Sequence, residues 1–468
     1  MSIVPSDSSH RNVFLILLIC GLTLRLLAVV FFHPPLISDD IDYQALAQSL
    51  AAGSGFELEG KPTAYRMPGY PLILAATYVL FGDSNLCMKL LQVLADITSC
   101  FLIFAIGKKM FSEGVGLLAL GIAAFFPIQI LYVSHVMTET IFTTVLLFIV
   151  WRVLNEQNGG WIWNALVLGA VIGIAILIRT TAVVLLPVIY LYRHSSKTRW
   201  VPNLREFALM TGMALIVVSP WIVRNYVEFH RVALTSNSGV NFWMGNHSGA
   251  SGSYSFPTVE NPLRSVQDDF ERSDLGFALG LEFITSHSSE FAILLGKKFA
   301  HFFAADYWLM TTIEYKPVWR SYPNAATVFA ELSGWNIAII HLPFMATLLL
   351  GLFGLIFHKG DDSRALFLFA GLILLWLFVH LFFYAGARYR FPIVPLFILT
   401  SAFGFHLIRT KTFLLSKLRL TTFVCLAGLF ISGWAAELWT IQSKKMSVEL
   451  LREHLKRPPP ETKEIPLR

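Results

Sequence analysis

The amino-acid sequence predicts an all-α polytopic membrane protein with about eleven transmembrane helices, outer-face loops and interfacial helices. Of its 468 residues, 55% are hydrophobic and only 14% are charged, whereas soluble globular chains carry about 25% charged residues. The hydrophobic residues form runs long enough to cross a bilayer core, which takes about 20 residues of helix. The surface of this chain therefore requires lipid as well as water as its solvent.

The apolar runs and the polar segments between them divide the chain into four regions. The N-terminal transmembrane region, 1–223, contains a polar segment at 33–85 that we expect to form the first outer loop and to carry the candidate functional residues. The second region is a polar stretch at 224–336, followed by C-terminal transmembrane helices at 337–440 and a polar tail at 441–468. The predicted spans are 13–32, 86–107, 115–132, 140–154, 161–178, 181–192, 207–223, 337–357, 365–384, 391–407 and 420–439. The first run lacks a small-residue cleavage site, so we expect it to be an anchor and not a cleaved signal.

The distribution of Lys and Arg over the short loops predicts the orientation of the helices. One set of loops is basic, and basic short loops face the cytoplasm. Its members are Arg11, Lys108, Lys109, Arg152, Arg193, Lys197, Arg199, Arg205, Lys359, Arg364, Arg409, Lys411, Lys417 and Arg419. We therefore expect a multi-pass protein of the plasma (inner) membrane with a cytoplasmic N-terminus, and segments 33–85 and 224–336 outside.

Charge and cysteine content restrict the possible partners. The net charge of +6 comes from short basic loops and not from one basic face, so no nucleic-acid partner is expected. The four cysteines lie in or beside apolar runs without any CxxC spacing. This pattern predicts no disulfide framework and no zinc site. We expect no cofactor, and the sequence leaves open whether a divalent metal is used.

Acidic residues gather where the first span ends. Asp39, Asp40 and Asp42 follow it directly. One interpretation is the start of an interfacial helix, with Ser38 as the cap and the acids stabilised by the helix dipole. A base placed at the membrane face is the second interpretation, and it accounts for three acids beside lipid. Glu139 is another acid predicted at the same face, where a helix-end charge is the alternative.

Some basic residues lie outside the basic cytoplasmic loops. Arg179, Arg388 and Arg390 are predicted on the outer side, where they could bind phosphate oxygens or anchor helix ends in the headgroup layer. Arg25 and Asp96 lie in the middle of the first two spans, and we expect them to form a structural ion pair.

Four segments share a recognisable pattern: 39–43 (DDIDY), 65–71 (YRMPGYP), 220–226 (PWIVRNY) with 239–246 (GVNFWMGN), and 388–392 (RYRFP). Together they resemble the GT-C type membrane glycosyltransferases, specifically the family 39 group related to protein O-mannosyltransferases and lipid A aminoarabinose transferases. Their order along the chain and the predicted topology make the resemblance fairly specific. Asp40 departs from relatives that carry Glu or Ser, which leaves open whether Asp39 or Asp40 is the base.

The resemblance implies a GT-C-like helical bundle that transfers a sugar from a polyprenyl-phosphate donor to an acceptor protein, lipid or glycan in the cell envelope. It implies catalytic roles for Asp39, Asp40 and Glu139. Donor phosphate is expected at Arg66, Arg388 and Arg390. Substrate contacts are expected from Asp42, Tyr43, Tyr65, Arg224 and Asn225. The alternatives are a transporter or lipid flippase, or a non-enzymatic subunit of an envelope-assembly complex.

Overall fold

The computed structural model of the chain describes residues 4–5, 7–36, 39–155, 160–194, 204–254, 261–313, 334–360 and 363–443. Ser38, the predicted helix cap, and nearly all of the predicted tail lie outside these residues.

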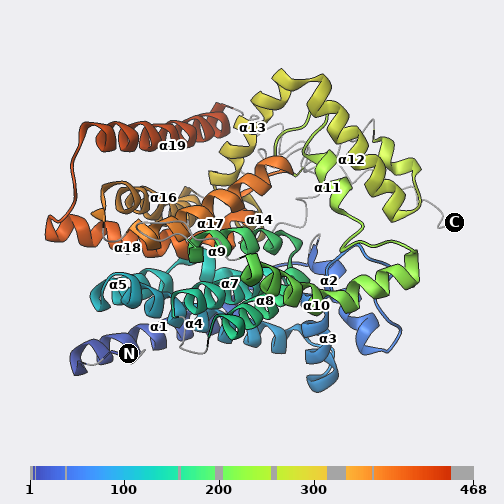
Figure 1. The fold of residues 1–468 in the computed structure, drawn as a ribbon, viewed down its shortest axis with the longest axis horizontal. Coiled ribbons are helices and arrows are strands. Elements are labelled where there is room, and N and C mark those ends of the chain that lie inside the picture. Colours follow the sequence, from blue (N-terminus) through green and yellow to red (C-terminus); the bar gives the residue numbers. More distant parts are fainter. Residues whose placement is uncertain are drawn as a thin grey trace, which may run out of the picture.

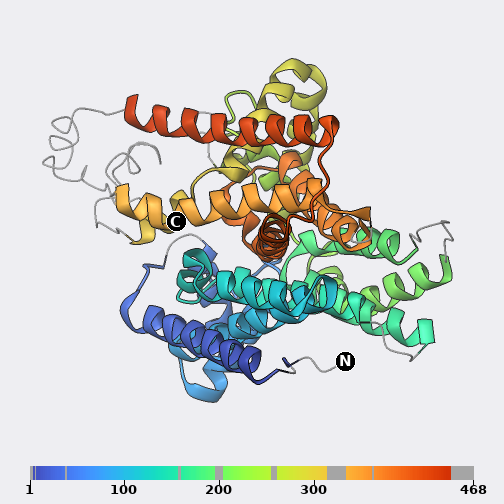
Figure 2. The same ribbon diagram turned by 90° about the vertical axis from the view of Figure 1, so that its left-hand side faces the viewer.

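Long helices run side by side and form the body of the molecule, with α19 along one side (Figure 1). The first group of bundle helices is α1 (Ser8–Phe31), α4 (Asn85–Met110), α5 (Glu113–Ala124), α7 (Thr138–Leu154), α8 (Gly160–Ile178), α9 (Leu185–His194) and α10 (Leu204–Phe229), of which α5 and α9 are short. The second group is α16 (Gly334–Phe357), α17 (Ser363–Phe382), α18 (Val394–Thr410) and α19 (Lys417–Ser443). Figure 2 shows the two groups as neighbouring halves.

Shorter elements gather at one end of the bundle (Figure 1). They include α2 (Asp39–Ala51), α3 (Gly69–Phe81), α11 (Ser238–Met244), α12 (Asp269–Ser286), α13 (Ser288–Phe303) and α14 (Tyr307–Ile313). The other short elements are α6 (Pro127–Tyr132), the 3₁₀ helices η1 (Thr180–Val184), η2 (Pro262–Ser265) and η5 (Ala387–Ile393), and a hairpin of β1 (Glu57–Leu58) with β2 (Lys61–Pro62).

The predicted all-helical, polytopic class is confirmed. Among the described residues, seven helices are long and apolar enough to cross a bilayer, and four shorter apolar helices accompany them. Many large apolar side chains on these helices are exposed, for example Ile16 on α1 and Leu374 on α17. Such exposure is expected where lipid replaces water as the solvent.

One predicted span is interrupted. The run 115–132 forms two helices, α5 and α6, because the backbone is extended at Phe126 and Pro127 begins the next helix. A proline lacks the N–H that would continue the hydrogen bonding of the preceding helix, but it fits the first turn of a new one. The span predicted at 181–192 likewise begins as the 3₁₀ helix η1 before α9.

The break between α5 and α6 explains the buried charge on α1. Arg25 pairs with Asp96 of α4, and both side chains are fully buried. Arg25 also donates hydrogen bonds to the carbonyls of Ala124, at 2.9 Å, and Ala123, at 3.1 Å, which end α5. The predicted structural pair is therefore confirmed, and it also satisfies carbonyls that a helix end would leave bare.

Candidate active site

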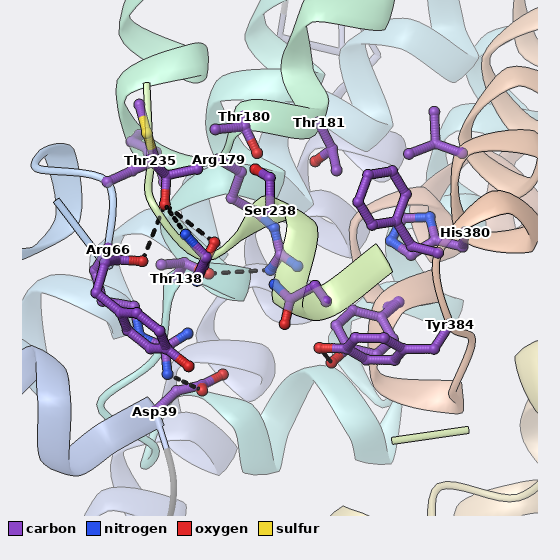
Figure 3. Close-up of a pocket in the computed structure, with 18 of the residues that line it drawn as sticks. Asp39, Arg66, Thr138, Arg179, Thr180, Thr181, Thr235, Ser238, His380 and Tyr384 are labelled. Atoms are coloured by element: carbon purple, nitrogen blue, oxygen red, sulfur yellow. Dashed lines mark hydrogen bonds and ion pairs between the residues drawn. The ribbon is translucent and has the colours of Figure 1, made fainter. Parts of the chain in front are cut away.

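A polar pocket opens where the short elements meet the ends of the long helices. Figure 3 shows Asp39 and Arg66 on one side of it and His380 and Tyr384 on the other. Its charged lining residues are Asp39 from α2, Arg66 from the loop before α3, Arg179 from the start of η1 and Arg388 from η5. Segments more than 300 residues apart in the sequence thus form one site.

Asp39 occupies the first turn of α2 and holds two arginines. Its Oδ1 lies 2.5 Å from Arg66 Nη2, and its Oδ2 lies 2.7 Å from Arg388 Nη2. Burial alone would raise the pKa of Asp39, but Arg66 and Arg388 outweigh it and lower the pKa well below the usual range of an aspartate. In this structure Asp39 is therefore an ionised acceptor at the wall of the pocket.

Arg388 joins Asp39 to a second acid. Its Nε donates to Glu139 Oε1 at 2.6 Å, and its guanidinium lies over the Trp308 ring, 5.2 Å from the centroid. Glu139 is fully buried in the first turn of α7 and does not line the pocket. Its carboxylate also forms an ion pair with Arg179, whose Nη1 lies 3.1 Å from Glu139 Oε1. Glu139 thus fixes the orientation of two arginines that do line the pocket.

Arg66 is fixed in the same way from the other side. Its Nε and Nη2 both approach Asp42 Oδ2, at 3.0 and 2.7 Å. Its guanidinium also lies 5.1 Å from the Tyr65 ring and 5.6 Å from the Tyr43 ring, and both tyrosines line the pocket. Tyr43 has its pKa raised to about 12 by burial, so its hydroxyl keeps its proton.

These contacts form one chain of alternating charges, which we name the charge ladder. Its members are Asp42, Arg66, Asp39, Arg388, Glu139 and Arg179. Three carboxylates alternate with three guanidinium groups, so the ladder as a whole is neutral when all six are ionised. Each of its three arginines is paired with carboxylates of the ladder and also lines the pocket.

The pocket wall also carries polar, uncharged side chains beside the ladder. They include Thr180, Thr181, Thr235, Asn237, Ser238 and Asn241. Aromatic residues complete it, and Tyr389 Oη donates to Tyr384 Oη at 3.1 Å. Hydroxyl and amide groups of this kind both donate and accept hydrogen bonds, as polyhydroxylated ligands require.

Asp40 points away from the pocket. Its side chain is 1% exposed, and it is absent from the pocket lining. Burial raises its pKa to about 8 despite the opposing effect of Arg388. The resemblance favours Asp39 by position and leaves the choice between the two adjacent acids open, and the structure gives the two acids opposite environments.

Arg390 also lies outside the pocket, unlike Arg388. Its side chain is 1% exposed. Its Nη1 donates hydrogen bonds to the carbonyls of Phe302, at 2.7 Å, and Ala304, at 2.5 Å. Its guanidinium stacks on Phe344, 3.8 Å from the ring centroid. The structure thus gives Arg390 a packing environment between α13, α16 and η5, where the sequence predicted a phosphate contact.

Arg224 and Asn225 tie α10 to the first loop. Arg224 donates to the carbonyls of Thr63, at 2.7 Å, and Phe56, at 3.2 Å. Asn225 donates to the Ala233 carbonyl at 2.8 Å. Neither residue lines the pocket, and their predicted substrate contacts stay a prediction.

The whole chain is similar to solved structures of a larger membrane protein. Two structures of the oligosaccharyltransferase from Archaeoglobus fulgidus, one tethered with an acceptor peptide and one in the apo form, each match with a TM-score of 0.50 and 10% identity. They cover 97% and 99% of this chain. The chain has a GT-C fold. It spans only 60–62% of the length of the oligosaccharyltransferase.

The chain shows two further similarities. Residues 61–223 match the family described as dolichyl-phosphate-mannose-protein mannosyltransferase. The ArnT protein from Cupriavidus metallidurans, bound to undecaprenyl phosphate, matches with a TM-score of 0.41 and 12% identity over 83% of this chain and 77% of its own. No curated protein sequence matches the chain.

Several pocket residues were not among the predicted site residues. Arg179 was noted as an outer arginine, but its pairing with Glu139 depends on packing between α7 and the start of η1. Thr138, next to Glu139 in the sequence, accepts a hydrogen bond from Arg179 Nη1 at 3.0 Å. Asn241 could have been found from the segment 239–246, which carries it into the pocket on α11. Within the described ranges, no group of three or more His, Cys, Asp and Glu side chains is arranged to hold a metal ion.

Proposed function

We propose that this protein is a glycosyltransferase that moves a sugar from a polyprenyl-phosphate donor to an envelope acceptor on the extracytoplasmic face of the plasma (inner) membrane. The observation that carries the proposal is the carboxylate of Asp39 in the pocket wall between Arg66 and Arg388. A general base and phosphate-binding cations are the two groups that such a transfer needs. The GT-C fold and the family matched by residues 61–223 support the same reaction.

In the proposed reaction, an acceptor hydroxyl oxygen forms a bond to the anomeric carbon while the bond from that carbon to the donor phosphate breaks. Asp39 takes the hydroxyl proton, and the electron pair of the broken bond stays on the polyprenyl phosphate. The phosphate then gains negative charge, which Arg66, Arg388 and Arg179 stabilise more strongly in the transition state than before it.

The low pKa of Asp39 gives the order of events in this proposal. While Arg66 and Arg388 are paired with Asp39, the Asp39 carboxylate is a weak base. A donor phosphate competes for the same guanidinium groups, which raises the pKa of Asp39 when the donor is bound. The base is therefore activated by the substrate that it serves.

The arrangement of the molecule supports the proposed orientation. The pocket elements α2 and α11 lie at one end of the bundle, whereas the N-terminus lies toward the other (Figure 1). With the N-terminus in the cytoplasm, as the basic loops indicate, the pocket opens at the extracytoplasmic face. The acceptor class is left as protein, lipid or glycan.

The test is an assay of the purified protein in detergent with a polyprenyl-phosphate sugar and an acceptor extract. We expect release of polyprenyl phosphate that depends on both the protein and the extract. A transporter, flippase or assembly subunit would leave the donor intact, and intact donor in the presence of folded protein would overturn the proposal.

A further inference from the structure

A buried pair of polar groups lies directly behind the charge ladder. Both carboxylate oxygens of Asp40 are buried, and neither has a hydrogen-bond partner among the residues that the structure describes. His135, between α6 and α7, faces this carboxyl with its Nδ1 3.9 Å from Asp40 Oδ2. His135 Nδ1 is also buried without a hydrogen-bond partner. Two such groups side by side need a shared proton or a bridging molecule to be satisfied.

The ring of His135 is fixed on its other sides. Its Nε2 lies 3.5 Å from Thr312 Oγ1, and its ring centroid lies 4.5 Å from that of Trp308. Its backbone carbonyl accepts a hydrogen bond from Gln92 Nε2 at 2.7 Å. Nδ1 is therefore the polar atom of this ring that is aimed at Asp40.

The charges around Asp40 leave it no dedicated cation. The charged and titratable groups that face it are Asp39 on α2, Tyr70 on α3, Lys89 on α4, His135, Glu139 on α7 and Arg388 on η5. Arg388 is already bonded to Asp39 and Glu139. In the described part of the chain, no lysine or arginine forms an ion pair with Asp40. An ionised Asp40 would therefore add an uncompensated negative charge to a ladder that is neutral without it.

We propose that Asp40 works in its protonated form beside a neutral His135, whose Nδ1 lies 3.9 Å from Asp40 Oδ2, and that it is a positioning residue for Asp39. His135 Nε2 then carries the ring proton and faces Thr312 Oγ1 at 3.5 Å. A neutral pair is the less costly arrangement in a site closed to water. Burial supports it, because it raises the pKa of Asp40 to about 8 and lowers the pKa of His135 to about 3.

The positioning role rests on the proposed function. A protonated Asp40 leaves Arg388 bonded to Asp39 and Glu139. An ionised Asp40 would attract Arg388 and weaken both bonds, so the geometry of the base would be lost at high pH. The sequence change that keeps the neutral form at every pH is Asp40→Asn, which is nearly isosteric with the protonated acid.

The first test needs no substrate. The melting temperature of purified wild type, Asp40→Asn and Asp39→Asn is measured from pH 5 to pH 9. An acid whose pKa is raised by folding loses stability as pH rises from its unfolded pKa to its folded pKa. We expect wild type to lose several degrees more than Asp40→Asn between pH 5 and pH 8.

Asp39→Asn is the matched control for this measurement. Folding lowers the pKa of Asp39 itself, so the stability that its carboxylate contributes is lost at more acidic pH and is constant over this range. Asp39→Asn should therefore still lose stability as pH rises above 5, with the loss ending at a lower pH than in wild type, because the Asp39 charge also raises the pKa of Asp40. Equal pH dependence in wild type and Asp40→Asn would overturn the protonated state, whatever the protein's reaction.

The second test measures the positioning role. Turnover of wild type should fall about tenfold from pH 7 to pH 9, because an acid with a pKa near 8 goes from about 90% protonated to about 10%. In Asp40→Asn the ratio of turnover at pH 9 to turnover at pH 7 should rise toward one. An unchanged ratio would remove the positioning role, and absence of turnover in every protein would count against the proposed function alone.

Discussion

Adjacent residues of one type differ in this site because their surroundings differ. Asp39 faces the pocket and two guanidinium groups, whereas Asp40 faces the protein interior and His135. The same contrast separates Arg388, which belongs to the charge ladder, from Arg390, which is bonded to backbone carbonyls. At the scale of the residue, orientation on a helical turn decides which member of each pair can act on a substrate.

Replacement of Asp39 by Asn should abolish sugar transfer while the protein still folds and inserts. Asn keeps the size of the side chain but cannot take a proton, and loss of a general base costs about 10²–10⁴ in rate. Turnover per folded molecule is the measurement. Asp83→Asn is the control, because Asp83 is an exposed acid that accepts a hydrogen bond from Gln48 and lies outside the pocket. Wild-type turnover in Asp39→Asn would remove Asp39 as the base.

Arg388 and Arg390 form a second matched pair. Arg388→Ala should cost roughly 2–4 kcal/mol of transition-state stabilisation, as deletion of a single oxyanion donor does. Arg388→Lys should recover only part of it, since Lys lacks the planar fork that binds Asp39 and Glu139 together. Turnover and donor KM are measured at a fixed concentration of folded protein.

Arg390→Ala should instead lower the melting temperature, because the change leaves the carbonyls of Phe302 and Ala304 without their donor. Its turnover per folded molecule should stay near the wild-type value. A stronger loss of turnover in Arg390→Ala than in Arg388→Ala would contradict the assignment of the phosphate contact to Arg388.

At the scale of the element, small residues place α11 against the pocket. A Cβ atom at Gly239 would lie 1.8 Å from the Ser273 carbonyl oxygen, and one at Gly245 would lie 1.9 Å from that of Phe383. The two glycines of the segment 239–246 therefore let α11 approach α12 and the end of α17. This close approach brings Ser238 and Asn241 into the pocket wall.

Gly245→Ala should displace α11 and enlarge the pocket. Overpacking of this kind costs roughly 1–3 kcal/mol of folding free energy, so we expect a lower melting temperature. We also expect a higher KM for the donor. Gly212→Ala is the control, since nothing lies within 4 Å of a Cβ atom at Gly212 on α10. Equal melting temperatures and KM values in the two variants would show that the approach of α11 is not required.

Much of the fold at this scale could be predicted from the sequence, but its interruptions could not. Apolar runs predicted the long helices, and the acids after the first span predicted α2. The division of the run 115–132 was missed because hydrophobicity alone does not register Pro127 as the start of a new helix. The sequence also placed Asp39 and Asp40 side by side without showing which one faces the pocket, because that depends on how α2 packs against α3.

At the scale of the whole molecule, the charge ladder joins α2, α7, the start of η1 and η5. Local patterns could indicate each charged residue but not these pairings, which connect residues as far apart as Asp39 and Arg388. The family resemblance supplied the missing information by grouping the segments that carry them. It did not distinguish Arg388 from Arg390, or assign Arg224 and Asn225 to contacts within the chain.

The proposed orientation predicts which sites are reached from outside the cell. With the four native cysteines replaced, a cysteine at Ser54 or Ser251 should react with an impermeant reagent in intact cells or spheroplasts. A cysteine at Ser416, before α19 in a basic loop, should react only after lysis. Labelling of Ser416 but not of Ser54 in intact spheroplasts would invert the topology and move the pocket to the cytoplasm.

The central claim is that Asp39 and the arginines around it transfer a sugar from polyprenyl phosphate. Its most direct test follows a labelled sugar from its polyprenyl phosphate into an acceptor extract, with purified wild type and Asp39→Asn, by mass spectrometry of both products. The account predicts labelled acceptor and an equal amount of polyprenyl phosphate from wild type, and neither product from Asp39→Asn. Equal transfer by the two proteins, or unconsumed donor with folded wild type, would contradict it.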